Sequence, residues 1–113
     1  MIMKYFWSNE VDSILSVGRS LEDAGICNWA LNREDALVAL AKLLEIGVAV
    51  LGGDVYLVKG AFVDSNYDNW YCDQSERESD SAFVERSITM ARSYIVNYRA
   101  LECSVLFAIV PKI

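Results

Sequence analysis

The sequence contains no histidine, one proline and six glycines among its 113 residues. Without histidine, neither a Ser-His-Asp nor a Cys-His catalytic arrangement can form. The glycine-rich phosphate-binding patterns GxGxxG and GxxxxGK(S/T) are also absent. We therefore predict a protein that is not an enzyme and needs no cofactor. The scarcity of proline and glycine argues against long linkers, so we expect residues 1–113 to form a single domain.

Cysteines are few and widely spaced, at Cys27, Cys72 and Cys103. A closed zinc site normally takes four Cys or His ligands, which three thiols without histidine cannot supply. A disulfide framework is not expected in a cytosolic chain. We predict free, buried or half-buried thiols that behave as small hydrophobic residues, and no metal site.

No segment is apolar over a length that could span a bilayer. No apolar run is longer than Val105–Val110, whereas a membrane helix needs about 20 such residues. Near the start, Lys4 is followed by three apolar residues before Ser8, and an export signal needs about 7–15. These features predict a cytoplasmic protein.

Acidic residues outnumber basic ones by 16 to 10, which gives a net charge of −6. A surface of this sign repels nucleic acid and anionic membranes, so we expect neither as a partner. It would attract a basic protein. Mild acidity also serves solubility alone, so the charge by itself leaves both interpretations open.

Two segments carry apolar residues at helical spacing. Asn32 is a favoured N-cap with Asp35 three positions on, and Gly47 suits the residue after a helix end, so we predict a helix over 33–46. A serine or aspartate at 79–81 can cap a second helix, predicted over 81–99. The apolar positions of the two helices are Ala36, Leu37, Leu40, Ala41, Leu43 and Leu44, then Val84, Ile88, Ala91, Ile95 and Tyr98.

Short apolar runs predict strands over 48–51, 55–58 and 104–110. The last is apolar from Val105 to Val110, which is typical of a central strand buried on both faces. A tight hairpin at Lys59-Gly60 would join 55–58 to 61–63. We interpret Gly52-Gly53 as a turn or bulge that allows backbones to approach closely.

The first third of the chain is less patterned. Ser8 can cap a short helix that buries Val11, Ile14 and Leu15, and residues 19–28 indicate a loop. Together these elements predict an α/β or α+β fold in two layers, with a sheet packed by the two main helices.

The most informative stretch is 64–80, which holds six acidic residues, one arginine and three large aromatics. We interpret it as an acidic loop. Its aromatics either close over the core or form an exposed anchor within a field of carboxylates that steers a basic partner. The predicted partner-binding residues are Asp54, Tyr67, Asp68, Trp70, Tyr71 and Asp73.

Two motifs in this region carry a family resemblance. Leu51-Gly-Gly-Asp-Val-Tyr56 and Tyr67-Asp-Asn-Trp-Tyr-Cys-Asp73 together resemble the pattern of a bacterial immunity-protein family of polymorphic toxin systems, catalogued as immunity protein 40. Asn28-Trp-Ala-Leu31 and Glu85-Arg-Ser-Ile88 fit as well, so the resemblance extends over about Ile14–Tyr98. It implies a small intracellular protein that binds a cognate toxin and blocks it, without catalysis of its own.

Two other functions stay open at this point. Asp54, Asp64, Asp68 and Asp73 could converge as a metal or acid–base site, which would make a small ligand-binding domain or an enzyme. Exposed strand edges could instead build a homo-oligomeric adaptor. The motif residues could also serve the fold alone.

Overall fold

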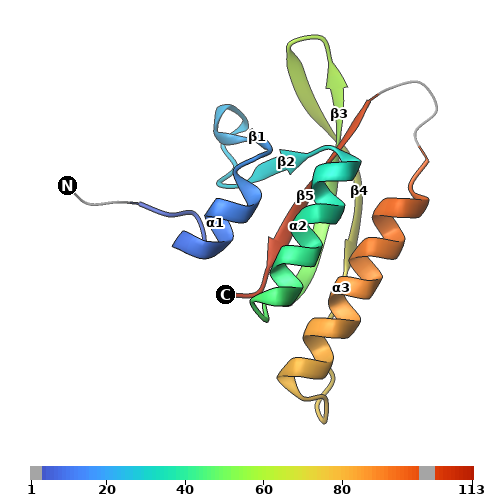
Figure 1. Cartoon of the computed structure of the whole chain (residues 1–113). Helices are drawn as coiled ribbons and strands as arrows, with labels where there is room; N and C mark the ends of the chain where they lie inside the picture. Colours follow the sequence, from blue (N-terminus) through green and yellow to red (C-terminus); the bar gives the residue numbers. More distant parts are fainter. Residues whose placement is uncertain (1–3, 100–103) are drawn as a thin grey trace.

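The computed structural model describes residues 4–99 and 104–113 (Figure 1). Three α-helices and five strands within these residues form an α+β fold, as the sequence predicted. In chain order the elements are α1 (Asn9–Leu15), β1 (Arg19–Ser20), the 3-10 turn η1 (Glu22–Ala24), β2 (Trp29–Leu31), α2 (Arg33–Glu45), β3 (Val50–Lys59), β4 (Phe62–Tyr71), α3 (Asp80–Asn97) and β5 (Val105–Pro111). Cys103 lies outside the described residues.

The five strands make one sheet in the order β1-β2-β5-β3-β4, and every neighbouring pair is antiparallel. β5 lies in the middle, between β2 and β3 (Figure 1). Its residues Phe107, Ala108 and Ile109 are all buried, because both faces of this strand are covered. The predicted central strand is confirmed, and Pro111 is its last residue, opposite Val50.

The two main helices begin where their caps predicted. The Asn32 side chain accepts the Asp35 N–H at 2.8 Å, and the Ser79 hydroxyl accepts the Ala82 N–H at 3.2 Å. α2 ends one residue earlier than predicted, before Gly47, whose φ of 70° is the left-handed conformation that ends helices.

The second helix differs from its prediction at both ends. α3 starts one residue earlier than the predicted 81–99 and ends two residues earlier, at Asn97. It stops because Tyr98 turns to an extended conformation and reaches β4 with its hydroxyl. The Arg33 guanidinium donates hydrogen bonds to the carbonyls of Ile95, Val96 and Tyr98, which satisfies groups that a helix end leaves unpaired.

α2 and α3 lie side by side across one face of the sheet, which gives the predicted two layers (Figure 1). The main core lies between the helices and this face. α1 packs at its side, capped by Ser8 as predicted, with Val11 and Leu15 buried and Ile14 partly buried. The largest fully buried side chains of the core include Leu40, Leu43, Phe83, Ile95, Phe107 and Ile109.

The opposite face of the sheet has a smaller apolar cluster near the hairpin. Leu21, which precedes η1, packs there with Ala30, Tyr56 and Ala108. The predicted loop over 19–28 therefore contains a two-residue strand and a 3-10 turn that cover part of this face. Such short elements have too few residues to show a period in the sequence.

Two strand predictions were wrong in extent. Residues 50–51 of the first run and all of 55–58 belong to one strand, β3, which continues through Gly52-Gly53, whereas residues 48–49 precede it. Residues 64–71 of the predicted acidic loop are not a loop, because they continue the strand predicted at 61–63 and form with its residues 62–63 the edge strand β4, which pairs with β3 through the predicted hairpin turn. An edge strand that is mostly solvated carries polar residues on both faces, so β4 lacks the alternation that identifies a half-buried strand.

Of the two cysteines described, Cys72 is buried as expected, but Cys27 is exposed. No α-helix in the described part of the chain is long and apolar enough to cross a membrane.

Candidate partner-binding surface

The residues predicted to bind a partner lie on the β3–β4 hairpin or just after it. The register pairs Gly52 with Tyr71, Gly53 with Trp70 and Asp54 with Asn69. Because side chains alternate along a strand, Trp70 points to the helix-covered face, whereas Tyr71 and Asn69 point to the opposite face. The neighbouring aromatics Trp70 and Tyr71 therefore have different surroundings.

Trp70 belongs to the core. Its side chain is 8% exposed, and its ring stacks on Tyr94 of α3 with centroids 4.8 Å apart. The ring lies over Gly53, where a Cβ atom would collide with it. Gly53 is thus needed for the close approach of Trp70. The sequence left open whether the aromatics pack on the core or form an exposed anchor, and Trp70 packs on the core.

Tyr67 is presented by a bulge in β4. Its φ of 67° is left-handed, and its side chain is 86% exposed. Neighbouring polar side chains stabilise this conformation. The Ser65 hydroxyl accepts the Tyr67 N–H at 3.1 Å, the Asn66 side-chain oxygen Oδ1 accepts the Asp68 N–H at 2.9 Å, and the Asn69 side-chain amide donates to the Tyr67 carbonyl at 3.1 Å.

Asp68 is positioned by the end of α3. The Tyr98 hydroxyl donates to its carboxylate at 2.5 Å and accepts from the Asn66 amide at 2.6 Å. Burial raises the pKa of Tyr98, and the hydrogen bond to the Asp68 carboxylate raises it further. The bulge is therefore tied to α3, while Asp68 itself stays exposed.

The face opposite the helices carries a shallow groove of about 180 Å³ beside Tyr71. Leu51, Asp54, Asn69 and Val110 are among the residues that line it. Partial burial raises the pKa of the Asp54 carboxyl, and no opposing charge lowers it. Tyr71, which pairs with Gly52 of this lining, is 74% exposed, so the same end of the sheet carries an exposed aromatic residue and the Asp54 carboxylate.

Asp73 follows the strand in a segment that Arg86 holds to α3. The guanidinium donates to the Asp73 carbonyl at 2.5 Å, to both carboxylate oxygens of Glu78 at 2.7 Å and to the Cys72 sulfur at 3.2 Å. These hydrogen bonds lower the pKa of Glu78 to about 2. Glu78 is thereby neutralised by an ion pair, whereas the Asp73 side chain remains exposed.

Arg86 was not singled out from the sequence as a structural residue, although it lies in the motif Glu85-Arg-Ser-Ile88. The next motif residue, Ser87, is fully buried and accepts the Val50 N–H at 2.9 Å. Asn28 is also buried and donates to the Ile109 carbonyl at 3.0 Å. Several residues of the resembling motifs therefore hold the fold together.

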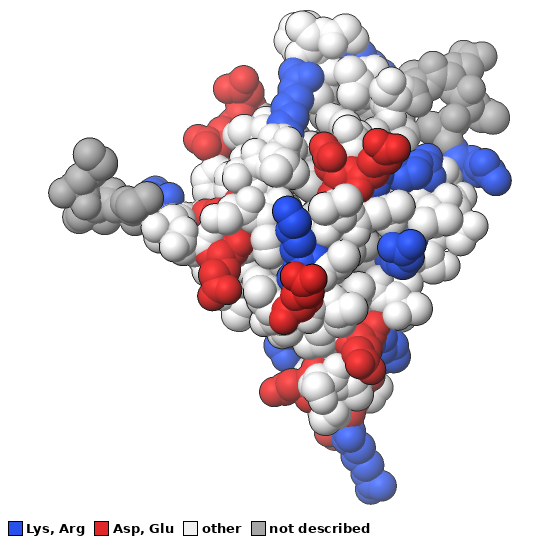
Figure 2. Space-filling model, in the orientation of Figure 1, with Lys and Arg blue, Asp and Glu red and all other residues white. Residues whose placement is uncertain are grey.

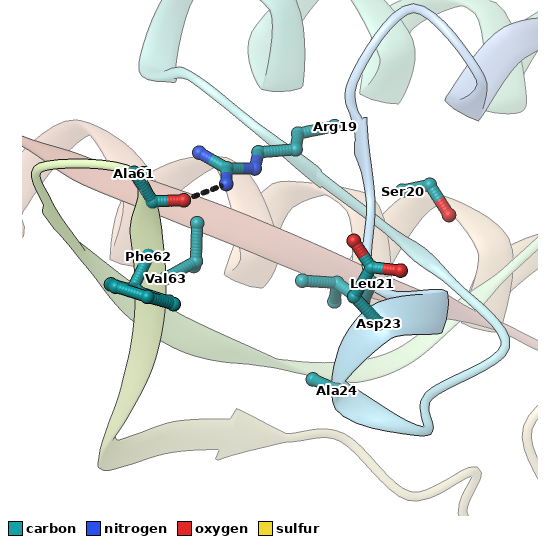
Figure 3. A pocket seen from close by; sticks show the side chains of 8 residues that line it. All are labelled: Arg19, Ser20, Leu21, Asp23, Ala24, Ala61, Phe62 and Val63. Carbon is teal, nitrogen blue, oxygen red and sulfur yellow. Dashed lines mark hydrogen bonds between the residues drawn. The ribbon is translucent and has the colours of Figure 1, made fainter.

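A second cleft, of about 250 Å³, lies between the β3–β4 turn and η1 (Figure 3). Arg19 reaches across it and donates to the Ala61 carbonyl at 2.5 Å. Asp23 and Phe62 also line the cleft. Sequence reasoning did not identify it, because its residues come from a loop and a turn with no shared motif.

The charges do not select the helix-covered side as a binding face. Figure 2 shows acidic and basic side chains interspersed there. Among residues 4–99 and 104–113, no three carboxylates, thiols or imidazoles group together so that they could hold a metal ion. Asp54, Asp64, Asp68 and Asp73 thus do not assemble into such a group.

A family model described as Immunity protein 40 matches residues 20–111 of the chain. The matched range contains β2 to β5, both main helices and all six residues predicted to bind a partner. Comparison with curated proteins and with solved structures found no match.

Proposed function

The chain belongs to the immunity protein 40 family, and from this premise we propose that it binds a cognate bacterial toxin in the cytoplasm and neutralises it by occlusion. The family match over residues 20–111 is the observation that carries this proposal. Occlusion needs a surface complementary to the toxin and no catalytic group. A standard complex of this kind buries about 1,600 Å² in total.

We place the toxin-binding surface at the β4 edge of the sheet. Here two exposed tyrosines, Tyr67 and Tyr71, stand among the carboxylates of Asp54, Asp68 and Asp73. Tyrosine is enriched among the residues that dominate binding energy at interfaces. The carboxylates would steer a basic toxin surface and speed association. Trp70 is buried beneath this surface, so its truncation would weaken toxin binding only by destabilising the fold.

Phe62 offers a matched comparison within β4. Phe62 and Tyr71 lie at opposite ends of β4 and are equally exposed, at 74%. Phe62 has Lys59 as its strand partner, whereas Tyr71 lies near Asp54 and Asp73. Phe62→Ala is therefore a matched control for Tyr71→Ala, since each removes an exposed ring from the same strand.

The candidate toxin for the test is the C-terminal domain of the protein encoded next to the chain's own gene. Co-expression with the wild-type chain should restore growth of cells that produce this domain. Tyr71→Ala should weaken binding about 30-fold, because truncating an interface anchor costs about 2 kcal/mol. Phe62→Ala should change the affinity less than threefold. Failure of the wild-type chain to bind or protect would refute toxin neutralisation, and equal effects of both variants would refute the placement of the surface.

A further inference from the structure

We infer that the toxin contributes an extended, basic segment that pairs with the free edge of β4 at residues 69–71 as an added strand. This inference rests on the proposed function and specifies how its surface works. Main-chain hydrogen bonds provide the affinity in such strand addition, and side chains on either side provide the specificity.

β4 is the last strand in the sheet order and, among residues 4–99 and 104–113, pairs only with β3. In an antiparallel ladder, hydrogen-bonded residue pairs alternate with pairs whose N–H and C=O groups point away from the partner strand. The Cys72 N–H donates to the Leu51 carbonyl at 2.9 Å, so this pair is hydrogen-bonded. The alternation then makes Gly53 and Trp70 hydrogen-bonded as well.

The two pairs in between must be of the other kind. Tyr71 lies opposite Gly52, and Asn69 lies opposite Asp54. The main-chain N–H and C=O groups of Asn69 and Tyr71 therefore point outward, to the free edge. Two donors and two acceptors at the spacing of a strand form a template for one more antiparallel strand.

Hydrogen bonds within the chain limit this template at both ends. On one side, the Ser65 hydroxyl accepts the Tyr67 N–H and the Asn66 side-chain oxygen accepts the Asp68 N–H. The Asn69 side-chain amide donates to the Tyr67 carbonyl. On the other side, β4 ends at Tyr71, and Arg86 binds the carbonyl of Asp73. The bulge and the arginine delimit a window for strand pairing at residues 69–71.

The charge around this window determines which kind of strand can pair with it. Asp68 and Asp73 flank it, Asp54 lies opposite Asn69, and no lysine or arginine occurs between Lys59 and Arg77. A second copy of this chain would bring the same carboxylates to the edge, with a net charge of −6 on each copy. Like charges across paired strands are destabilising, and opposite charges are stabilising. A segment with lysine or arginine at alternating positions fits the edge, and a second copy does not.

The inference is tested at one position by two substitutions. Tyr71→Ala removes the side chain and keeps the N–H group. Tyr71→Pro removes the outward N–H as well and spares the β3 ladder, because proline is tolerated where a strand's N–H faces solvent. The probe is the same isolated toxin domain as above. Tyr71→Pro should bind it about tenfold more weakly than Tyr71→Ala, which corresponds to one main-chain hydrogen bond.

Hydrogen exchange of the wild-type chain gives a second readout that needs no substitution. The amides of Asn69 and Tyr71 should exchange fast in the free chain and become protected at least tenfold in the complex. The amide of Trp70 should be protected in both states, since it pairs with β3. This measurement also decides the matter if thermal melts show that Tyr71→Pro does not fold.

Each outcome is decisive. Protection of both amides, with Tyr71→Pro weaker than Tyr71→Ala where it folds, supports strand addition. A toxin domain that binds tightly while both amides stay unprotected overturns strand addition and leaves the proposed function standing. A self-associated free chain with protected edge amides overturns it in favour of a second copy. A wild-type chain that binds no toxin domain overturns the proposed function and this inference together.

Discussion

Replacing Trp70 with alanine should destabilise the protein by about 3–5 kcal/mol, the usual cost of truncating a buried tryptophan. The side chain is 8% exposed and lies between Gly53 and Tyr94. Loss of the stacked pair with Tyr94 accounts for about 0.5–1.5 kcal/mol of this cost. The remainder comes from the cavity over Gly53, which the rigid ladder between β3 and β4 cannot close.

Urea denaturation followed by far-UV circular dichroism measures this cost, with Tyr71→Ala as the control. Tyr71 is the next residue on the same strand and is 74% exposed, so its truncation should change stability by less than about 0.5 kcal/mol. Trp70→Phe gives a finer test. The buried indole N–H makes no hydrogen bond within the described residues, and an unsatisfied buried donor costs about 1–3 kcal/mol. Trp70→Phe should therefore cost less than half as much as Trp70→Ala. An unchanged urea midpoint for Trp70→Ala would refute the placement of this ring in the core.

Two further predictions concern the helices. Leu40→Ala should destabilise the protein by about 2–5 kcal/mol, because Leu40 is buried against the sheet. Lys42→Ala, on the exposed side of α2, should change stability little. Equal shifts of the two variants in a denaturant titration would contradict the face assigned to this helix. Arg86 lowers the pKa of Glu78 from 4.5 to about 2 in the folded state, so the pair stabilises the protein fully above pH 4.5 and loses this contribution as the pH falls toward 2. Glu78→Gln should flatten the fall of the melting temperature over that range, and an unchanged pH profile would show that the ion pair does not form in solution.

The parts of the fold that could be predicted are those in which local signals and burial agree. α2 and α3 carry both a capping residue and an apolar face, and β5 is apolar along its whole length because it is the middle strand. β3 was divided in two because glycine usually interrupts a strand. Here Gly53 is required by a side chain from the neighbouring strand, and a contact between strands cannot be derived from one strand's own sequence.

The candidate surface shows the same limit. Trp70 and Tyr71 are adjacent aromatics in an acidic stretch, and under a loop interpretation nothing distinguishes them. Once the stretch is recognised as a strand, alternation places one ring on the core side and the other in solvent. The register alone does not identify which ring is buried, because Trp70 lies opposite Gly53 and Tyr71 lies opposite Gly52. The stacking of Trp70 on Tyr94 of α3 identifies it.

The bulge explains how the protein can carry an exposed strand of ten residues without a lysine or proline inside it. Such an edge normally invites pairing along its whole length, and natural sheets block it with these residues or with bulges. In β4 the hydrogen bonds around Tyr67 remove the middle of the strand from pairing, and the carboxylates repel another copy of the same chain. Between the bulge and the end of β4, this leaves a short window at Asn69 and Tyr71. A partner of opposite charge can still use this window, so the features that protect the edge also restrict what it can bind.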